Sequence, residues 1–359
     1  MKHFFAIYQM HSCPPAPFLT MSKLTNSIDN NTYKYKTYCC SPEDVRNTLE
    51  EYGVAIVPNV LDADECRQMI DGTWNYLEHI TQTWSTPISK TDTSTWKQFY
   101  KLCPSHGMLM QHFGVGHCQA AWDVRQNPKV IDVYAQMYNC SPNELLASFD
   151  GMSFCLPPEV TNRGWARDNH SWYHTDQSYL TPQFHSVQSW VTAYDVNPGD
   201  ATLTVFQGSH RFHGEFQAHF DITDKANWFK LTKEQEQFYL DKGCIKTHIV
   251  CPAGSMVLWD SRTIHCGANP SKLREFSNFR LVSYVCYKPR DHSDKKRLAK
   301  QIKKKQDAYW ALRTTTHTPD NIKMFSLQPN CYNPANRPPP TTPIDYPTLT
   351  ELGMCVGGL

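Results

Sequence analysis

The chain has 359 residues, 40% of them hydrophobic, which is enough apolar material for a large folded core. Its 35 basic and 34 acidic residues nearly cancel, so no net field draws it to nucleic acid or to an anionic membrane. It has no apolar run of about 18 residues, and its 14 cysteines are scattered, unlike the framework of a small secreted domain. We expect a globular intracellular protein with free thiols and neither a nucleic-acid nor a membrane partner.

The N-terminal segment, residues 1–38, is polar and weakly periodic after a short apolar start. That start is too brief for the apolar region of a signal peptide, and Met21 is an alternative initiation codon. We predict that residues 1–38 are disordered and that a single folded domain occupies residues 39–312.

Helix signals dominate the next part of the chain. Ser41, followed by proline and two acidic residues, is typical of a helix start, and Gly53 ends this helix. An apolar strand over 54–61, a helix from 62 to about 79 and an amphipathic helix over 127–138 follow. The front third of the domain is therefore predicted to be mainly helical.

From about Ala147 the sequence changes to short β-branched and aromatic runs separated by Gly, Pro, Asn and Asp. This pattern predicts a mainly β fold with flanking helices, built on a double-stranded β-helix (a jelly roll, cupin-like) over about 147–290. A helical insertion is expected at 231–240. The expected strands are 146–154, 171–176, 187–196, 202–206, 246–250, 255–260 and 279–287.

Two segments follow the predicted sheet. Residues 293–312 form a lysine-rich helix, which we interpret as a solvated face; docking of an anionic substrate is the alternative. The tail over 313–359 is rich in Pro, Asn and Thr and is expected to be extended, either packed on the surface or mobile.

The strongest chemical signal is the pair His174 and Asp176 on a predicted strand. Residues i and i+2 of a strand project from the same face, roughly 6.5 Å apart, so one metal ion can bind both side chains. An imidazole and a carboxylate suit Fe(II), and a second histidine from a distant strand completes a two-histidine, one-carboxylate facial triad. His265, which we place at the end of another strand, is that candidate.

The triad leaves three coordination positions, enough for a bidentate 2-oxoacid and O2. A fixed cation is then needed for the far carboxylate of the 2-oxoacid. Arg280, which opens an apolar strand, supplies a planar guanidinium suited to a carboxylate. A His-x-Asp pair alone is a weak signal, but the order of pair, distant histidine and later arginine is specific.

With these residues, the region from Glu50 to about Tyr287 resembles the phytanoyl-CoA dioxygenase family of Fe(II)- and 2-oxoglutarate-dependent oxygenases. The resemblance also rests on residues 53–65, on 190–211 with its Gly-Ser-His turn, and on the Pro-Ala-Gly-Ser run at 252–255. It implies Fe(II) as the metal, 2-oxoglutarate and O2 as co-substrates, and a small molecule as the substrate. It further implies that His174, Asp176 and His265 bind iron and that Arg280 binds 2-oxoglutarate.

Several residue assignments have competitors. Arg274 is the other candidate anchor, and we prefer Arg280 because it follows an aromatic residue and opens a strand. His210 is assigned to a structural turn, since a fourth ligand would block a needed coordination position. The alternating residues of one strand face are candidates for lining the co-substrate pocket, with core packing as the alternative; they are Gln188, Trp190 and Thr192. A possible zinc cluster with no common ligand spacing is interpreted as metal-free; it comprises Cys103, His106, His112, His117 and Cys118.

The sequence thus predicts a dioxygenase that hydroxylates a C–H bond of a small molecule or acyl-type substrate and releases succinate and CO2. The carboxylate of Asp176 favours hydroxylation over halogenation, because the related halogenases have a small residue in its place. The alternatives are a non-catalytic metal-binding β-barrel and an oxygenase directed at nucleic acid or protein. The sequence predicts neither the substrate nor the oligomeric state.

Overall fold

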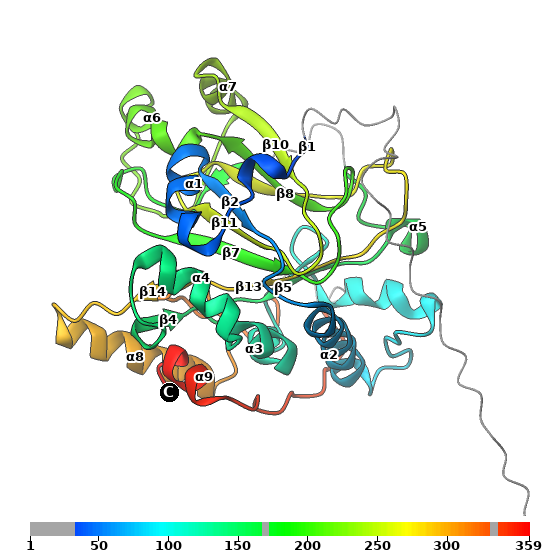
Figure 1. Cartoon of the computed structure of the whole chain (residues 1–359). Coiled ribbons are helices and arrows are strands. Elements are labelled where there is room, and N and C mark those ends of the chain that lie inside the picture. Colours follow the sequence, from blue (N-terminus) through cyan, green and yellow to red (C-terminus); the bar gives the residue numbers. More distant parts are fainter. Residues whose placement is uncertain (1–32, 167–171, 331–336) are drawn as a thin grey trace, which may run out of the picture.

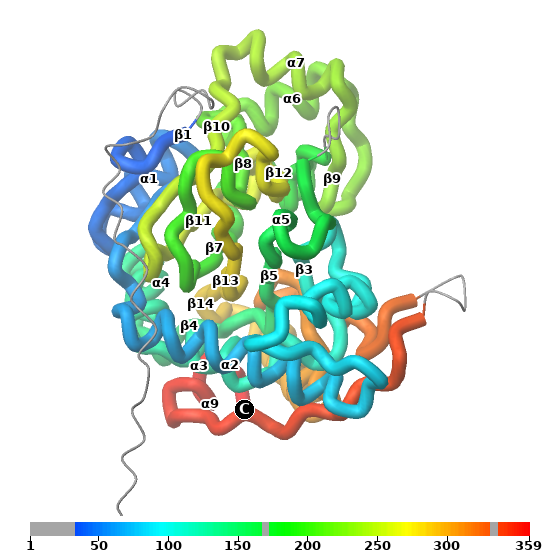
Figure 2. Tube along the Cα trace, turned by 90° about the vertical axis from the view of Figure 1, so that its right-hand side faces the viewer, coloured from blue at the N-terminus to red at the C-terminus, as the bar shows by residue number. Residues whose placement is uncertain are grey.

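The computed structural model describes residues 33–166, 172–330 and 337–359 (Figure 1). Two six-stranded sheets face each other, and a layer of helices covers the outer side of one of them, as the view in Figure 2 also shows. This arrangement confirms the predicted jelly roll with flanking helices. Among the described residues no helix is both long enough and apolar enough to cross a bilayer.

The first sheet carries the two predicted histidine ligands. Its strands pair antiparallel, except that β1 and β10 run parallel. In spatial order they are β1 (Tyr33–Lys34), β10 (Ile245–Ile249), β8 (Thr202–Gln207), β12 (His265–Ala268), β6 (His174–Thr175) and β9 (Phe229–Lys230).

The second sheet carries the predicted arginine and is antiparallel throughout. In spatial order its strands are β2 (Val54–Val57), β11 (Met256–Asp260), β7 (Val187–Thr192), β13 (Arg280–Tyr284), β5 (Met152–Cys155) and β3 (Leu109–Met110). A separate two-stranded sheet pairs β14 (Tyr287–Pro289) with β4 (Leu145–Ala147).

Successive side chains along a strand point alternately into the core between the two sheets and into the cores on their outer faces. Val205 on β8 and Trp190 on β7 pack in the core shared by the two sheets. Their neighbours point the other way: Phe206 joins the aromatic cluster outside the first sheet, and Val191 joins the helical side of the second. The period of two therefore gives each sheet two buried faces.

The helical layer packs on the outer face of the second sheet. Asp62 caps α2, and its side chain accepts hydrogen bonds from backbone N–H groups of the first turn. The side chain of Glu65 in turn accepts from the backbone N–H of Asp62. Gly53 ends α1 with φ 78°, and a Cβ there would lie 2.5 Å from atoms of His210 and Thr263, so this position requires glycine. The layer comprises α1 (Val45–Tyr52), α2 (Ala63–Thr81), α3 (Gln119–Arg125) and α4 (Pro128–Tyr138).

The first sheet is covered on its outside by two helices, of which α7 (Lys233–Asp241) confirms the insertion predicted at 231–240 and α6 (His213–His219) was not predicted. Helices α6 and α7 bury Phe216 and Tyr239 against Phe206. The short remaining elements are helix α5 (Pro158–Thr161) and the 3-10 helices, labelled η. These are η3 (Lys36–Tyr38), η4 (Pro42–Asp44), η5 (Thr93–Leu102), η6 (Val115–His117), η7 (Pro142–Glu144) and η8 (Ser209–Phe212).

The lysine-rich helix forms as α8 (Lys295–Trp310), but one side of it is buried. Lys305 is fully buried, donates to the backbone carbonyl of Ala147 and lies 4.0 Å from the ring centre of Phe149. The interpretation of this helix as a solvated face therefore holds only for its outer side.

Three boundary predictions need correction. The prediction that residues 1–38 are disordered is wrong for residues 33–38, because β1 pairs with β10 and Tyr38 is buried in the core; residues 1–32 lie outside the described residues. The tail over 313–359 is not simply extended, since it contains α9 (Glu351–Gly357), which packs against β4. His265 was predicted at the end of a strand. It is instead the first residue of β12, because β11 ends at Asp260 and a turn separates the two strands.

Candidate metal centre

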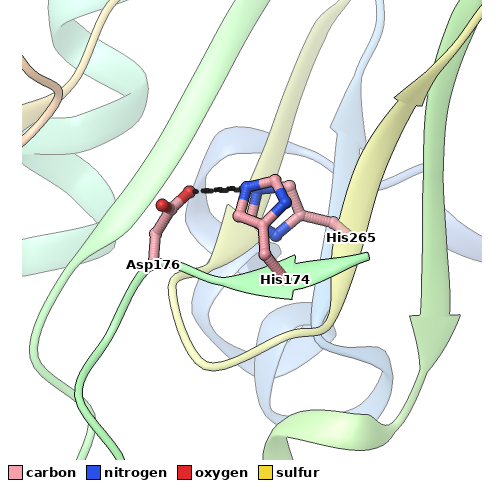
Figure 3. Close-up of side chains that lie close together, drawn as sticks. All are labelled: His174, Asp176 and His265. Atoms are coloured by element: carbon pink, nitrogen blue, oxygen red, sulfur yellow. Dashed lines mark ion pairs between the residues drawn. The ribbon is translucent and has the colours of Figure 1, made fainter. Parts of the chain in front are cut away.

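His174, Asp176 and His265 converge at one point between the sheets (Figure 3). His174 on β6 and His265 on β12 are direct register partners. Their Nε2 atoms lie 3.4 and 3.2 Å from Oδ2 of Asp176, which directly follows β6. All three side chains are buried, and their ligand atoms lie within 4.8 Å of one another. Among the described residues, this is the one such group of three or more.

Backbone carbonyls orient both imidazoles. Nδ1 of His174 lies 3.1 Å from the carbonyl oxygen of Trp172, and Nδ1 of His265 lies 2.9 Å from that of Thr263. Each Nδ1 therefore carries the proton and donates it, which leaves the Nε2 lone pair directed at the shared point. Burial lowers the pKa of His265, which favours the neutral imidazole that a metal needs.

The carboxylate of Asp176 is held ionised. Burial acts to raise its pKa, but His317 and His174 outweigh this effect and hold the pKa well below its usual range. The side-chain amide of Gln188 donates to Oδ2 of Asp176 over 3.0 Å. Two neutral imidazoles and one carboxylate on a single side are the donor set of a mononuclear iron centre, so the residues present fit the metal.

Arg280 and Arg274 have very different surroundings. Arg274 is fully engaged: it binds both carboxylate oxygens of Glu159, at 2.8 and 2.5 Å, and Oδ1 of Asp200 at 3.0 Å. Arg280 lines the cavity, stacks over Trp190 and makes one contact of 3.2 Å to the Ala201 carbonyl. Its Nε has no hydrogen-bond partner among the described residues. Arg280 is thus the arginine with donors left for an anion.

Of the three other residues predicted to line the pocket, only Gln188 lines the cavity. Gln188 lines the cavity and contacts the candidate ligand Asp176. Trp190 lies behind the lining, where its ring supports Arg280 at 5.2 Å. Thr192 does not reach the cavity and instead donates to the Tyr194 carbonyl over 2.7 Å. Trp259, which we did not predict, lines the cavity with an indole N–H that has no partner among the described residues.

A cavity of about 440 Å³ opens on the metal centre. Part of its wall comes from residues that sequence reasoning missed and that lie far apart in the chain: Asp150, Trp228, His317 and Phe325. Trp228 is 53% exposed, and its ring lies 5.7 Å from that of His174. No motif or spacing marks these four residues, because loops rather than strands bring them together.

Two earlier interpretations can now be placed in the fold. His210 directs Nε2 at the carbonyl of Glu50, 3.0 Å away, and lies outside the metal centre. The suggested zinc ligands serve separate contacts: His106 stacks on Trp172 at 3.8 Å, while His112 and His117 contact the carbonyls of Ser326 and Arg313.

Known proteins are similar to this chain in sequence or in fold. The family model described as phytanoyl-CoA dioxygenase (PhyH) matches residues 49–272. The "Ava biosynthesis cluster protein O" of Aspergillus versicolor is 25% identical over 265 residues, which cover 71% of this chain and 80% of that protein. Hypothetical protein JW0805 from Escherichia coli is 13% identical, with a TM-score of 0.56 over 90% of this chain and 85% of its own. A putative oxidoreductase from Salmonella typhimurium LT2 is 11% identical, with a TM-score of 0.56 over 90% and 86%.

The jelly roll and its buried His-Asp-His group provide the fold and the donor set of a mononuclear non-haem iron enzyme. More particularly, the chain belongs to the phytanoyl-CoA dioxygenase family. Iron and 2-oxoglutarate are accordingly its metal and co-substrate, and its activity is that of an oxidoreductase.

Proposed function

We propose that this protein is a dioxygenase that hydroxylates a C–H bond of a small molecule and converts 2-oxoglutarate and O2 into succinate and CO2. The observation that carries the proposal is the buried His-Asp-His group in a cavity that Arg280 also lines, with a single hydrogen bond of its side chain to other described residues. In this proposal His174, Asp176 and His265 bind Fe(II), and Arg280 binds the far carboxylate of 2-oxoglutarate.

The surrounding residues support these roles. Gln188 holds the Asp176 carboxylate in place, and the carbonyls of Trp172 and Thr263 fix the two imidazoles. Arg280 is buried and rests on Trp190, so its guanidinium is already oriented and desolvated before an anion arrives. Bound iron and 2-oxoglutarate supply the oxidising chemistry. The protein holds the ligands on one side and excludes water from the reacting carbon.

The cavity favours a small, largely apolar substrate. Its volume of about 440 Å³ lies in the range of small-molecule sites, and its wall includes the rings of Trp172, Trp228 and Phe325. The similar fungal protein is named for a biosynthesis cluster, which agrees with a metabolite substrate. The net charge of +1 gives no support to nucleic acid as the substrate.

Succinate formation tests the proposal. Protein with Fe(II), 2-oxoglutarate and O2 should release succinate, and small apolar metabolites should stimulate the release, with one hydroxylated product formed per succinate. His174→Ala should abolish the stimulated release. Stimulation by oligonucleotides alone, or unchanged turnover in the His174 variant, would contradict the proposal.

A further inference from the structure

The cavity has a second polar group besides the metal centre, on the side where the substrate would lie. Asp150 and His317 both line the cavity, and the mechanism proposed above uses neither of them. Asp150 lies just before β5, whereas His317 belongs to the segment of residues 314–327, here called the C-terminal loop, that follows α8. The C-terminal loop lies beyond residues 49–272, where the family model matches.

Asp150 is a buried carboxyl group, 7% exposed, that accepts hydrogen bonds from the Ser148 hydroxyl and the Cys286 thiol. Its Oδ2 accepts from the Ser148 hydroxyl over 2.6 Å, and that hydroxyl in turn accepts from the backbone N–H of Cys286. No cationic side chain within the described ranges forms an ion pair with Asp150. Arg125 lies nearby but donates to the backbone carbonyls of Gly116 and Asp150. A buried carboxyl group without a cation retains acceptor capacity for a ligand.

His317, on the C-terminal loop, lines the same cavity as Asp150. Its Nε2 lies 4.0 Å from Oδ1 of Asp176, whereas His174 and His265 both approach Oδ2. The ring is 28% exposed and makes no hydrogen bond to any other residue in the described part of the chain. A role as a fourth ligand is disfavoured, since it would occupy a position that 2-oxoglutarate or O2 needs. The ring is therefore placed to contact what lies above the metal.

The C-terminal loop is held against Asp150 by backbone contacts. Thr315 donates its backbone N–H to the carbonyl of Phe149, and its hydroxyl accepts from the N–H of the same residue, at 2.8 and 3.0 Å. The hydroxyl of Thr314 accepts from Gly116. These contacts place Asp150 and the C-terminal loop side by side, and burial raises the pKa of Asp150.

We propose that Asp150 and His317 together accept hydrogen bonds from a donor group of the substrate, an ammonium or a hydroxyl, and so select which carbon faces the iron. The substrate class is then an apolar or aromatic small molecule that carries one such group. This inference rests on the proposed function, because it concerns the same cavity. The aromatic rings of the wall hold the hydrocarbon part, and the two polar side chains set its direction.

Binding to the anaerobic complex tests this inference without turnover. The visible charge-transfer band of Fe(II) with 2-oxoglutarate is recorded first, and its change on titration then reports binding of a third molecule. Three probes share one framework: phenethylamine, phenethyl alcohol and propylbenzene. We expect the amine or the alcohol to bind about tenfold more tightly than the hydrocarbon, the effect of one hydrogen bond to a charged acceptor.

Variants assign the preference to residues. Asp150→Asn and His317→Ala should each reduce the preference about tenfold, whereas the surface variants Asp123→Asn and His292→Gln should keep it. Asp150→Asn should weaken the amine more than the alcohol, because the variant keeps an acceptor oxygen but loses the negative charge. His317→Ala decides alone should Asp150→Asn fail to fold.

Two results would overturn the inference: no preference among the three probes, including no binding by any of them, or an unchanged preference in the folded variants. Failure of the proposed function looks different, because the charge-transfer band itself would then be missing.

Discussion

The two sides of the cavity are built in different ways. The metal side consists of His174 and His265 on paired strands, with Arg280 on the opposite sheet, and strand hydrogen bonds fix their backbones. The substrate side consists of residues 105–111, Trp228 and the C-terminal loop, which are joined by contacts between distant parts of the chain. The chemistry is thus placed on rigid elements and the recognition on loops, which can vary without disturbing the ligands.

The largest expected effect comes from removing a ligand on the metal side. Asp176→Ala deletes the one carboxylate near two neutral imidazoles, so iron affinity should fall by a factor of 100 or more, on the order of the largest losses seen even for outer-shell partners. Metal analysis after gel filtration measures the loss. The matched control is His210→Gln, which should keep one iron per chain because His210 serves the Glu50 carbonyl. Loss of iron from the control alone would contradict the assignment.

The two arginines should separate binding from stability. Arg280→Gln removes a charged donor facing the cavity, so the dissociation constant for 2-oxoglutarate should rise roughly 10- to 100-fold, with the fold kept. Arg274→Gln leaves Glu159 and Asp200 without their shared cation and should lower the free energy of unfolding by about 3–5 kcal/mol. Calorimetry and chemical denaturation provide the two measurements. The reverse pattern would make Arg274 the anchor.

A smaller effect is expected at the wall of the cavity. Trp228→Ala removes an exposed ring beside His174, so KM for the substrate should rise about tenfold, the value of a partly buried aromatic contact. Iron and 2-oxoglutarate affinities should stay within about twofold of the parent, since Trp228 touches neither Arg280 nor Asp176 by any hydrogen bond. Steady-state kinetics with the substrate found by succinate release checks this. Equal losses in all three constants would mean that the two sides are not independent.

A separate effect concerns acid and acts on stability, not on binding. Burial and the charge of Arg125 lower the pKa of His117 to about 3, and its Nε2–H donates to the Arg313 carbonyl next to the C-terminal loop. Below pH 6.5 His117 binds a proton in the unfolded chain but stays neutral in the folded chain. Stability is therefore complete above that pH and falls towards pH 3, by at most about 1.4 kcal/mol per pH unit from this histidine.

Denaturation between pH 7 and 4.5 should show this slope, and His117→Gln should reduce it. Hydrogen exchange should rise first in residues 313–327, before it rises in the strands that carry the metal ligands. An equal slope in the variant would assign the acid sensitivity to other groups, such as His213 or His248, whose burial lowers the pKa of each to about 4.

The metal side was largely predictable because its geometry is local. The i, i+2 spacing of His174 and Asp176 brings them to one metal even though β6 has only two residues and Asp176 lies just beyond it. The predicted place of Arg280 at the start of an apolar strand is also observed, since β13 begins at this residue. Thr192 shows the limit: alternation gives the face of a strand, but not how far along that face the cavity extends.

The substrate side was not predictable for a physical reason. Asp150 and His317 are 167 positions apart, and what brings them together is a loop fastened to the backbone of Phe149 and Gly116. Such contacts have no period and no fixed spacing. The burial of Lys305 was not predictable for the same reason. A lysine-rich helix predicts a solvated face, and this is correct only for the outer side of α8.

A crystal structure of the protein grown without O2 and soaked with Fe(II) and 2-oxoglutarate tests the central claim most directly. The account predicts one iron bound by Nε2 of His174, Nε2 of His265 and the carboxylate of Asp176, with the far carboxylate of 2-oxoglutarate on Arg280. Metal at another site, or 2-oxoglutarate bound away from Arg280, would contradict it.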